Sequence, residues 1–296
     1  MKLKEIREIG SRGVLFTYEF GDSVYLIKTK SCLILCDTSE GLEEMDYVKK
    51  YIKDHNLTNL SMYIFNSHSD YDHIWGNYAF PDCEIISHEL CRERMLERSP
   101  FDLVQYSRPE IKLKLPTITF SERLAFAESG IEFVYAPGHT VCSAICIDNI
   151  DKVIYAGDLI EAPIPYLDYL NLNQYVKTLE FIKQLDFPTL ITSHSQIVEK
   201  RLIDENITYL KDVISGKYLT FTSEYLPVRH GFNLKNLLLL EFEEKVKIAD
   251  YQAYKMALWD FIIRKHQLKN PRIWDLTEIS YQELKDDLAE YYRKNY

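Results

Sequence analysis

The first two thirds of the chain alternate between short apolar runs, which predict strands, and segments with a helical spacing of apolar residues. The predicted strands are 14–20, 24–29, 32–36, 62–65, 84–87, 118–127, 131–135, 141–147, 152–155 and 189–192. The predicted helices are 42–54, 89–98, 172–185 and 197–214. This order describes two β-rich runs, each followed by helix, and the pattern alone indicates an α/β or α+β fold.

Two segments depart from this alternation. Residues 99–118 carry three prolines and no clear period, so we predict an irregular segment that covers a functional site. After Gly216 the character changes, and we divide the chain into a domain over 1–216 and a C-terminal extension over 217–296. In the extension we predict strands at Tyr218–Phe221 and Leu237–Phe242, a helix over 249–267, and a last helix with Ser280 and Glu283 forming a capping box. The sequence leaves the role of this extension open among a lid, a dimer element and packing.

The largest concentration of side chains that can bind a metal follows the strand predicted at 62–65. The six residues His68-Ser69-Asp70-Tyr71-Asp72-His73 hold two imidazoles and two carboxylates. Loops at the carboxyl ends of strands are where such folds build sites. Imidazole and carboxylate ligands suit Zn²⁺, Fe or Mn²⁺. A polar surface loop is the alternative reading, but four metal-capable side chains in six positions favour a metal site.

This stretch, with three later ones, resembles the motifs of the metallo-β-lactamase superfamily. The later matches are Ala136-Pro137-Gly138-His139-Thr140, Tyr155-Ala156-Gly157-Asp158 and Thr192-Ser193-His194-Ser195, in the family's order and spacing. The resemblance covers about residues 10–215. It implies an α+β fold, the four-layer αββα sandwich of that family, here followed by a C-terminal, mainly helical extension.

The resemblance also implies a centre of two divalent metal ions (Zn, Fe or Mn) held by seven side chains. Metal one would take His68, Asp70 and His139, metal two would take Asp72, His73 and His194, and Asp158 would bridge them. The spacing within 68–73 does not by itself separate the two sets. Asp72 would lie close to both ions, where it could act catalytically by orienting the nucleophile or shuttling a proton.

Asp70 is the one departure from the family pattern, because most members carry a second histidine at this place. A carboxylate there is similar to the flavodiiron branch, which uses Glu. The extra negative charge hardens the site, which makes iron or manganese a stronger candidate than in an all-histidine site.

The function implied is a dinuclear metal-dependent hydrolase that acts on an ester, thioester, lactone or phosphodiester through a metal-bridging hydroxide. One alternative is a flavodiiron-like oxygen or nitric oxide reductase with a separate electron donor, and another is a non-catalytic metal-binding sensor. The reductase ranks lower because residues 217–296 carry neither a flavodoxin-like phosphate loop nor a βα alternation, and the cysteines lack cluster spacing.

Other polar residues are assigned plainer roles. We predict a turn role for Asp37, a helix-start role for His88, and surface or packing roles for His55, His230 and His266. The stretch Pro163–Tyr169 is rich in tyrosine and could either line the pocket or pack the edge of the sandwich.

Charge and composition limit which binding partners and which cellular location we expect. The net charge is −10, which disfavours broad binding of a phosphate backbone, so we expect a small-molecule substrate and consider a nucleic acid unsuited. The amino terminus is charged without an apolar run, no run is long enough to span a membrane, and the six cysteines form no Cys-x-x-Cys pair. We therefore expect a cytoplasmic protein with reduced thiols and no membrane association, and leave a homo-oligomer open.

Overall fold

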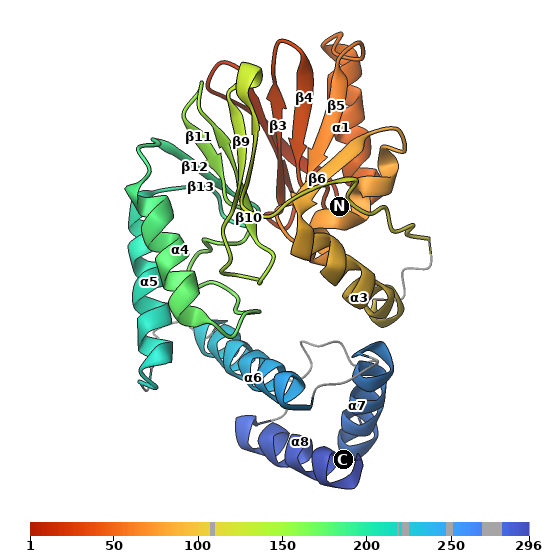
Figure 1. The fold of residues 1–296 in the computed structure, drawn as a ribbon, viewed down its shortest axis with the longest axis vertical. Coiled ribbons are helices and arrows are strands. Elements are labelled where there is room, and N and C mark those ends of the chain that lie inside the picture. The colour runs from red at the N-terminus through yellow and green to blue at the C-terminus, as the bar shows by residue number, and fades with distance from the viewer. Residues whose placement is uncertain (107–109, 218, 221–224, 247–250, 268–279, 296) are drawn as a thin grey trace.

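The structure, a computed structural model, describes residues 1–296 except 107–109, 218, 221–224, 247–250, 268–279 and 296 (Figure 1). Two sheets face each other at the centre. In strand order the first contains β1 (Leu3–Ile9), β2 (Gly13–Tyr18), β3 (Ser23–Lys28), β4 (Cys32–Cys36), β5 (Ser61–Phe65), β6 (Glu84–His88) and β7 (Ile118–Phe120). The second contains β13 (Gln196–Val198), β12 (Thr189–Thr192), β11 (Val153–Tyr155), β10 (Ala144–Asp148), β9 (Ile131–Tyr135) and β8 (Arg123–Phe126).

Helices cover the outer face of each sheet. Helix α1 (Leu42–Asp54) buries Met45 and Val48 against the first sheet, while α4 (Leu172–Gln184) and α5 (Lys200–Ile214) cover the second. Between the sheets lies a third apolar layer, in which the rings of Phe65 and Phe133 stack 4.8 Å apart. Burial on both faces of each sheet is why strands such as Cys32–Cys36 are apolar throughout. The predicted αββα sandwich is confirmed.

Strand direction determines where the loops meet. β5 runs parallel to β4 and β6, and β11 runs parallel to β12. β9 has the same direction as β11, because each pairs antiparallel with β10. The carboxyl ends of β9, β11 and β12 therefore share one edge of the second sheet, and β5 brings its own end to the facing edge of the first.

Several predicted boundaries are wrong, for identifiable reasons. The segment 118–127 is not one strand: it divides at Ser121 into β7 and β8, which belong to different sheets. Strand β1 was not predicted, because an edge strand with mostly exposed, charged side chains has no period-2 signal. The predicted helix at 197–214 begins only at Lys200, after the short strand β13.

Helix α3 (Glu89–Gln105) extends into the segment predicted to be irregular and includes Pro100. Its continuation is held by packing, since Leu103 and the following Tyr106 join an apolar cluster around Trp75. This cluster also contains residues of the short helices α2 (Tyr71–Ile74) and η1 (Trp75–Ala79). Tertiary contacts here override the proline that suggested an end to the helix.

The C-terminal extension consists of α6 (Tyr225–Val246), α7 (Tyr251–His266) and α8 (Tyr281–Asn295). The predicted strand Leu237–Phe242 is wrong, since this run lies inside α6, where Leu239 packs with apolar residues of α7 and α8. The strand predicted at Tyr218–Phe221 begins and ends on residues outside those described. The capping box is confirmed, because Ser280 N–H donates to Glu283 Oε2 and Glu283 N–H donates to Ser280 Oγ. None of the helices described is both long and apolar enough to cross a membrane.

Candidate metal centre

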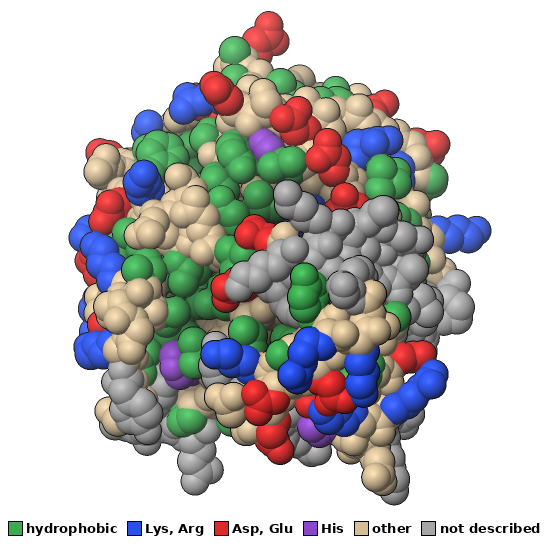
Figure 2. All heavy atoms as spheres, turned by 60° about the horizontal axis from the view of Figure 1, so that its bottom comes forward, with side chains coloured by type: hydrophobic (Ala, Val, Ile, Leu, Met, Phe, Trp, Pro, Cys, Tyr) green, Lys and Arg blue, Asp and Glu red, His purple; other side chains and the backbone are tan. Residues whose placement is uncertain are grey.

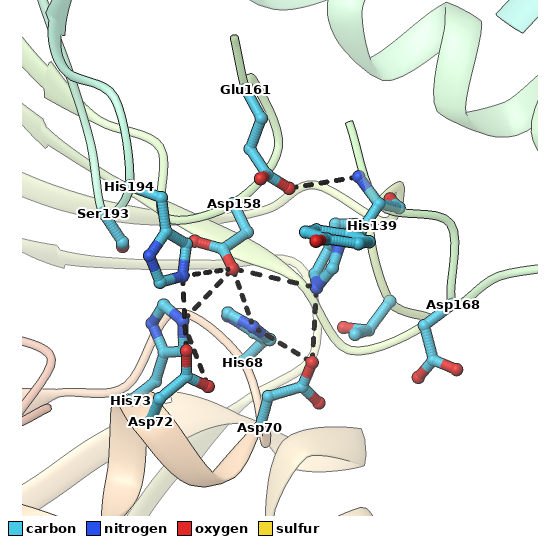
Figure 3. A network of polar contacts seen from close by, with 12 residues as sticks. His68, Asp70, Asp72, His73, His139, Asp158, Glu161, Asp168, Ser193 and His194 are labelled. Atoms are coloured by element: carbon cyan, nitrogen blue, oxygen red, sulfur yellow. Dashed lines mark hydrogen bonds and ion pairs between the residues drawn. The ribbon is translucent and has the colours of Figure 1, made fainter. Parts of the chain in front are cut away.

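The seven predicted ligands come from four loops at the shared edge of the two sheets (Figure 3). The loop after β5 supplies His68 and Asp70, and α2, which follows directly, supplies Asp72 and His73. The other three side chains follow strands of the second sheet: His139 after β9, Asp158 after β11 and His194 after β12. Residues up to 126 positions apart in the sequence, His68 and His194, thus face one point.

Asp158 lies at the centre of the cluster. Its Oδ2 is 3.1 Å from His194 Nε2, 3.2 Å from His73 Nε2, 3.8 Å from His68 Nε2 and 3.9 Å from His139 Nε2. Gly157 makes this approach feasible, since its φ is +54° and an added Cβ would lie 2.6 Å from Ser67 Oγ. One carboxylate oxygen therefore faces four imidazoles.

Around Asp158 the other candidates form two triads whose potential ligand atoms all lie within 4.8 Å of one another. In the first, Asp70 Oδ2 is 3.5 Å from His68 Nε2 and 3.3 Å from His139 Nε2. In the second, Asp72 Oδ2 is 3.3 Å from His194 Nε2, and His73 completes the group.

Three buried atoms in this cluster have no hydrogen-bond partner among the described residues: His68 Nε2, His73 Nε2 and Asp158 Oδ1. Buried polar atoms are rarely left in this state, and each such case needs an explanation. The donor set of imidazole nitrogens and carboxylate oxygens, with unsatisfied atoms directed inward, fits divalent cations.

Contacts at the outer Nδ1 atoms orient all four imidazoles. His73 Nδ1 lies 2.8 Å from Asp37, His194 Nδ1 lies 2.7 Å from Asp22, and His68 Nδ1 lies 2.9 Å from Ser67 Oγ. His139 Nδ1 is 3.1 Å from the carbonyl oxygen of Tyr166. Such contacts turn Nε2 toward the centre and select the tautomer that can ligate a metal.

Asp37 forms one group of potential ligand atoms with His68 and His73, but its carboxylate is engaged elsewhere. It accepts hydrogen bonds from Ser67 N–H, Ser67 Oγ and Tyr155 Oη in addition to its contact with His73. With a φ of +60°, Asp37 also turns the chain after β4, in line with the predicted turn role. Sequence reasoning missed Asp22, for which the turn Gly21-Asp22-Ser23 gave no signal beyond its shape.

The imidazoles and carboxylates of the cluster shift one another's pKa values. Burial alone would lower the pKa of His139, but its hydrogen bond to Asp70 and the charge of Asp158 raise the pKa to about 10. The pKa values of His73 and His194 are raised in the same way, against burial, by Asp158 first. Burial would raise the pKa of Asp158, yet His194 and His73 hold it well below the usual range. The carboxylates are therefore ionised, and the cluster attracts positive charge, whether protons or metal ions.

The remaining predicted histidine roles agree with the structure. His88 lies directly before α3, accepts a hydrogen bond at Nδ1 from Leu90 N–H and contacts the Ser121 carbonyl through Nε2. His55 stacks on Tyr51 at 3.8 Å. His230 contacts Tyr209 Oη, and His266 pairs with Asp287.

A cavity of about 360 Å³ opens beside the cluster and reaches it at Asp70, Asp72, His139, Asp158 and His194. Within Pro163–Tyr169, Tyr166 lines the cavity, so the prediction of pocket lining is confirmed for this tyrosine. The nearby Ile164 is buried in the apolar layer under α4 and α5.

The comparisons with known proteins agree with this architecture. The family model of the metallo-beta-lactamase superfamily matches residues 17–194. The chain belongs to this superfamily. The metallo-β-lactamase match spans the strands and loops that carry all seven candidate ligands, so the resemblance seen in the motifs is confirmed at the level of the family.

Solved structures show the same fold at low sequence identity. A metallo-beta-lactamase from Pontibacter korlensis is 19% identical, with a TM-score of 0.58 over 71% of this chain and 100% of that one. One from Hirschia baltica is 15% identical, with a TM-score of 0.58 over 71% and 98%. The metallo-beta-lactamase FIM-1 from Pseudomonas aeruginosa, solved in a mono-zinc form, is 12% identical, with a TM-score of 0.60 over 72% and 96%. No curated protein matches the sequence.

Proposed function

We propose that this chain is a metal-dependent hydrolase of small acyl or phosphoryl esters, with two divalent ions in one centre. His68, Asp70 and His139 would hold one ion, Asp72, His73 and His194 would hold the other, and Asp158 would be shared. The observation that carries this proposal is the position of Asp158 Oδ2, within 3.1–3.9 Å of four imidazole Nε2 atoms. Two ions are favoured because the other candidate ligands form two separate triads around this shared carboxylate.

Two bound ions of this kind would supply activated water as a nucleophile and polarisation of the substrate's carbonyl or phosphoryl oxygen. The residues of the chain supply the geometry. Asp72 contacts His194 through Oδ2 and lies 3.8 Å from His73 through Oδ1, at the wall of the cavity. From there its carboxylate can accept a proton from the attacking water and orient it toward the substrate. The outer contacts of Asp37 and Asp22 keep two of the imidazoles in place during turnover.

The test begins with protein stripped by a chelator and reloaded with Zn²⁺, Mn²⁺ or Fe²⁺. Metal content is measured by mass spectrometry, and each form is assayed on chromogenic esters, thioesters, lactones and phosphodiesters. We expect two ions per chain and metal-dependent hydrolysis. Asp158→Ala should lose more activity than the roughly 10- to 100-fold cost of changes outside the ligand shell. Asp186→Ala, an exposed carboxylate remote from these loops, is the matched control and should behave as the parent.

The redox alternative is tested in the same preparation. The reduced iron form is mixed with oxygen and with nitric oxide in the presence of an external reductant. If the iron form consumes oxygen or nitric oxide and no metal form hydrolyses any substrate, the protein is a reductase and the hydrolase proposal is wrong. Two bound ions with neither activity would favour the sensor.

A further inference from the structure

The cavity beside the candidate centre has a defined composition. Its volume of about 360 Å³ lies at the lower end of the range for small-molecule sites, which limits the substrate to a compact one. Two aromatic pairs belong to its lining. The rings of Tyr71 and Tyr106 lie 4.4 Å apart, and those of Tyr166 and Phe232 lie 5.5 Å apart edge to face. Such aromatic rings offer apolar surface against which a compact apolar group can pack.

The guanidinium groups that line the cavity already face carboxylates. Arg98 Nη1 lies 2.5 Å from Asp168 Oδ2, which Arg94 also contacts at 2.8 Å. Burial would raise the pKa of Asp168, but Arg98 and Arg94 hold it below the ordinary value, so this pair is ionic.

Arg229 on α6 is held similarly. Its guanidinium lies 3.4 Å from Glu161 Oε2, donates to the Ile164 carbonyl at 2.7 Å, and stacks 4.3 Å from the centre of the Tyr166 ring. Its hydrogen bonds and stacking therefore hold it to the protein's own groups.

The charged residues of the cavity disfavour a substrate that carries an additional anionic group. Apart from the seven candidate ligands, the described charged residues of the lining are Asp102, Glu161, Asp168, Arg98 and Arg229. Carboxylates thus outnumber guanidinium groups in this part of the lining. Figure 2 brings forward the side of the molecule where the helical extension lies, and on it Lys and Arg are mixed with Asp and Glu while hydrophobic side chains gather nearer the middle. Because each guanidinium group of the described lining is already engaged by a carboxylate, an anionic substrate group placed here would find no free guanidinium partner among these residues.

Resting on the hydrolase proposed above, we infer that the substrate is an uncharged carboxylic ester or thioester with a compact apolar group, and that Phe232 of α6 contacts this group. Phosphodiesters and esters with a second acidic group are then poor substrates. The C-terminal extension, through this residue, takes part in substrate selection.

The experiment uses the full-length, metal-loaded protein and two substrates of matched shape. 4-Nitrophenyl butyrate and mono-(4-nitrophenyl) succinate have the same leaving group and similar acyl length, but the succinate ends in a carboxylate where the butyrate has a methyl group. We expect kcat/KM for the butyrate to exceed that for the succinate by about tenfold or more. Bis(4-nitrophenyl) phosphate should be slower than both.

The role of Phe232 is tested on the same helix. Phe232→Ala should lower kcat/KM for the butyrate by about tenfold and affect 4-nitrophenyl acetate less, because the shorter acyl group reaches the wall less fully. Val228→Ala changes a side chain of α6 that is 49% exposed and should leave all rates unchanged.

The outcomes separate this inference from the proposed function. Faster metal-dependent hydrolysis of the succinate or the phosphodiester would overturn the inference and leave the hydrolase standing. If no ester is hydrolysed, the hydrolase proposal fails. The ester part of the inference fails with it, and calorimetric binding of the unreactive butyranilide then tests the part that remains, the contact with Phe232: binding weakened by Phe232→Ala supports this contact, and binding that is absent or unchanged in the variant overturns it.

Discussion

The loops that follow β5, β9, β11 and β12 differ from the C-terminal helices in how much the sequence reveals. The loops place seven metal-capable side chains at one edge, and each motif is a short stretch in which polar identity is tied to chemistry. Helices α6 to α8 carry no comparable motif, yet α6 forms one wall of the same cavity through Arg229, Phe232 and Asn236. Residues that bind metal must be of particular types, whereas residues that form a wall need only shape. The candidate metal centre can therefore be predicted from sequence, whereas the wall of the cavity beside it cannot.

Asp70 offers the largest test within the loop region. Its Oδ2 lies near both imidazoles of the first triad, so we expect Asp70→Ala to bind about one ion per chain instead of two. Asp70→His should bind two ions again and shift the preference toward zinc, because imidazole is a softer ligand than carboxylate. Metal analysis after competition among Zn²⁺, Mn²⁺ and Fe²⁺ measures both effects. Retention of both ions by Asp70→Ala with unchanged affinity would remove Asp70 from the ligand set.

How well an element could be predicted depends on whether its local sequence pattern agrees with its burial in the fold. The sequence predicted the helix at 42–54 and the strands at 32–36 and 131–135 with the bounds the structure has, because their patterns agree with their burial. It predicted a strand at Leu237–Phe242, since four consecutive leucines fit a buried strand as well as a buried helix. Asp22, Tyr71 and Tyr106 were not predicted as site residues. Asp22 approaches His194 only through the relative position of two sheets, and local pattern carries no information about that.

The second prediction uses the pH dependence of metal uptake. Without metal, the pKa of His139 is about 10 and those of His73 and His194 are also raised, so these imidazoles carry protons at neutral pH. Ligation requires neutral imidazole, and metal binding should therefore release more than one proton near pH 7 and tighten as the pH rises. Calorimetric titration in two buffers with different ionisation enthalpies measures the release.

The same shifts affect the stability of the metal-free protein. A raised histidine pKa contributes stability that is fully present below the ordinary pKa, near 6.5, and is lost as the pH rises through the folded value. Thermal stability without metal should thus fall between neutral pH and about 10, while the metal-loaded form should change less. Equal pH profiles for the two forms would contradict the charge distribution described for the cluster.

The third prediction tests whether α6 helps to position the loops that carry the candidate ligands. Asn233 is fully buried, and its side chain donates a hydrogen bond to the Pro165 carbonyl and accepts one from Leu167 N–H. These two bonds fix the backbone on both sides of Tyr166, whose carbonyl oxygen contacts His139 Nδ1. We expect Asn233→Ala to lower the free energy of unfolding by about 1–3 kcal/mol, because backbone groups lose their partners. It should also weaken binding of one ion, since His139 loses its fixed orientation.

The matched variant is Asn206→Ala on α5. Asn206 is equally buried and makes two hydrogen bonds to the backbone of Glu161, at the other end of the same segment. A similar loss of stability with a smaller change in metal affinity is expected. Equal effects of the two variants on metal affinity would mean that the segment acts as one rigid unit and that α6 has no special role.

The smallest expected effect lies farthest from the chemistry, at the start of α8. Ser280 Oγ accepts a hydrogen bond from Glu283 N–H at 3.2 Å, and removing this cap in Ser280→Ala should cost about 1 kcal/mol of helix stability. Ser280→Asn, which keeps an acceptor at the cap, should recover most of it. Chemical denaturation monitored by circular dichroism measures both. Metal content and kcat/KM should stay at parent values, because α8 packs on α6 and α7 through Leu284 and Leu288 and does not line the cavity with any described residue. A change in the metal content of Ser280→Ala would instead show that the loops with the candidate ligands are energetically coupled to the extension as far as α8.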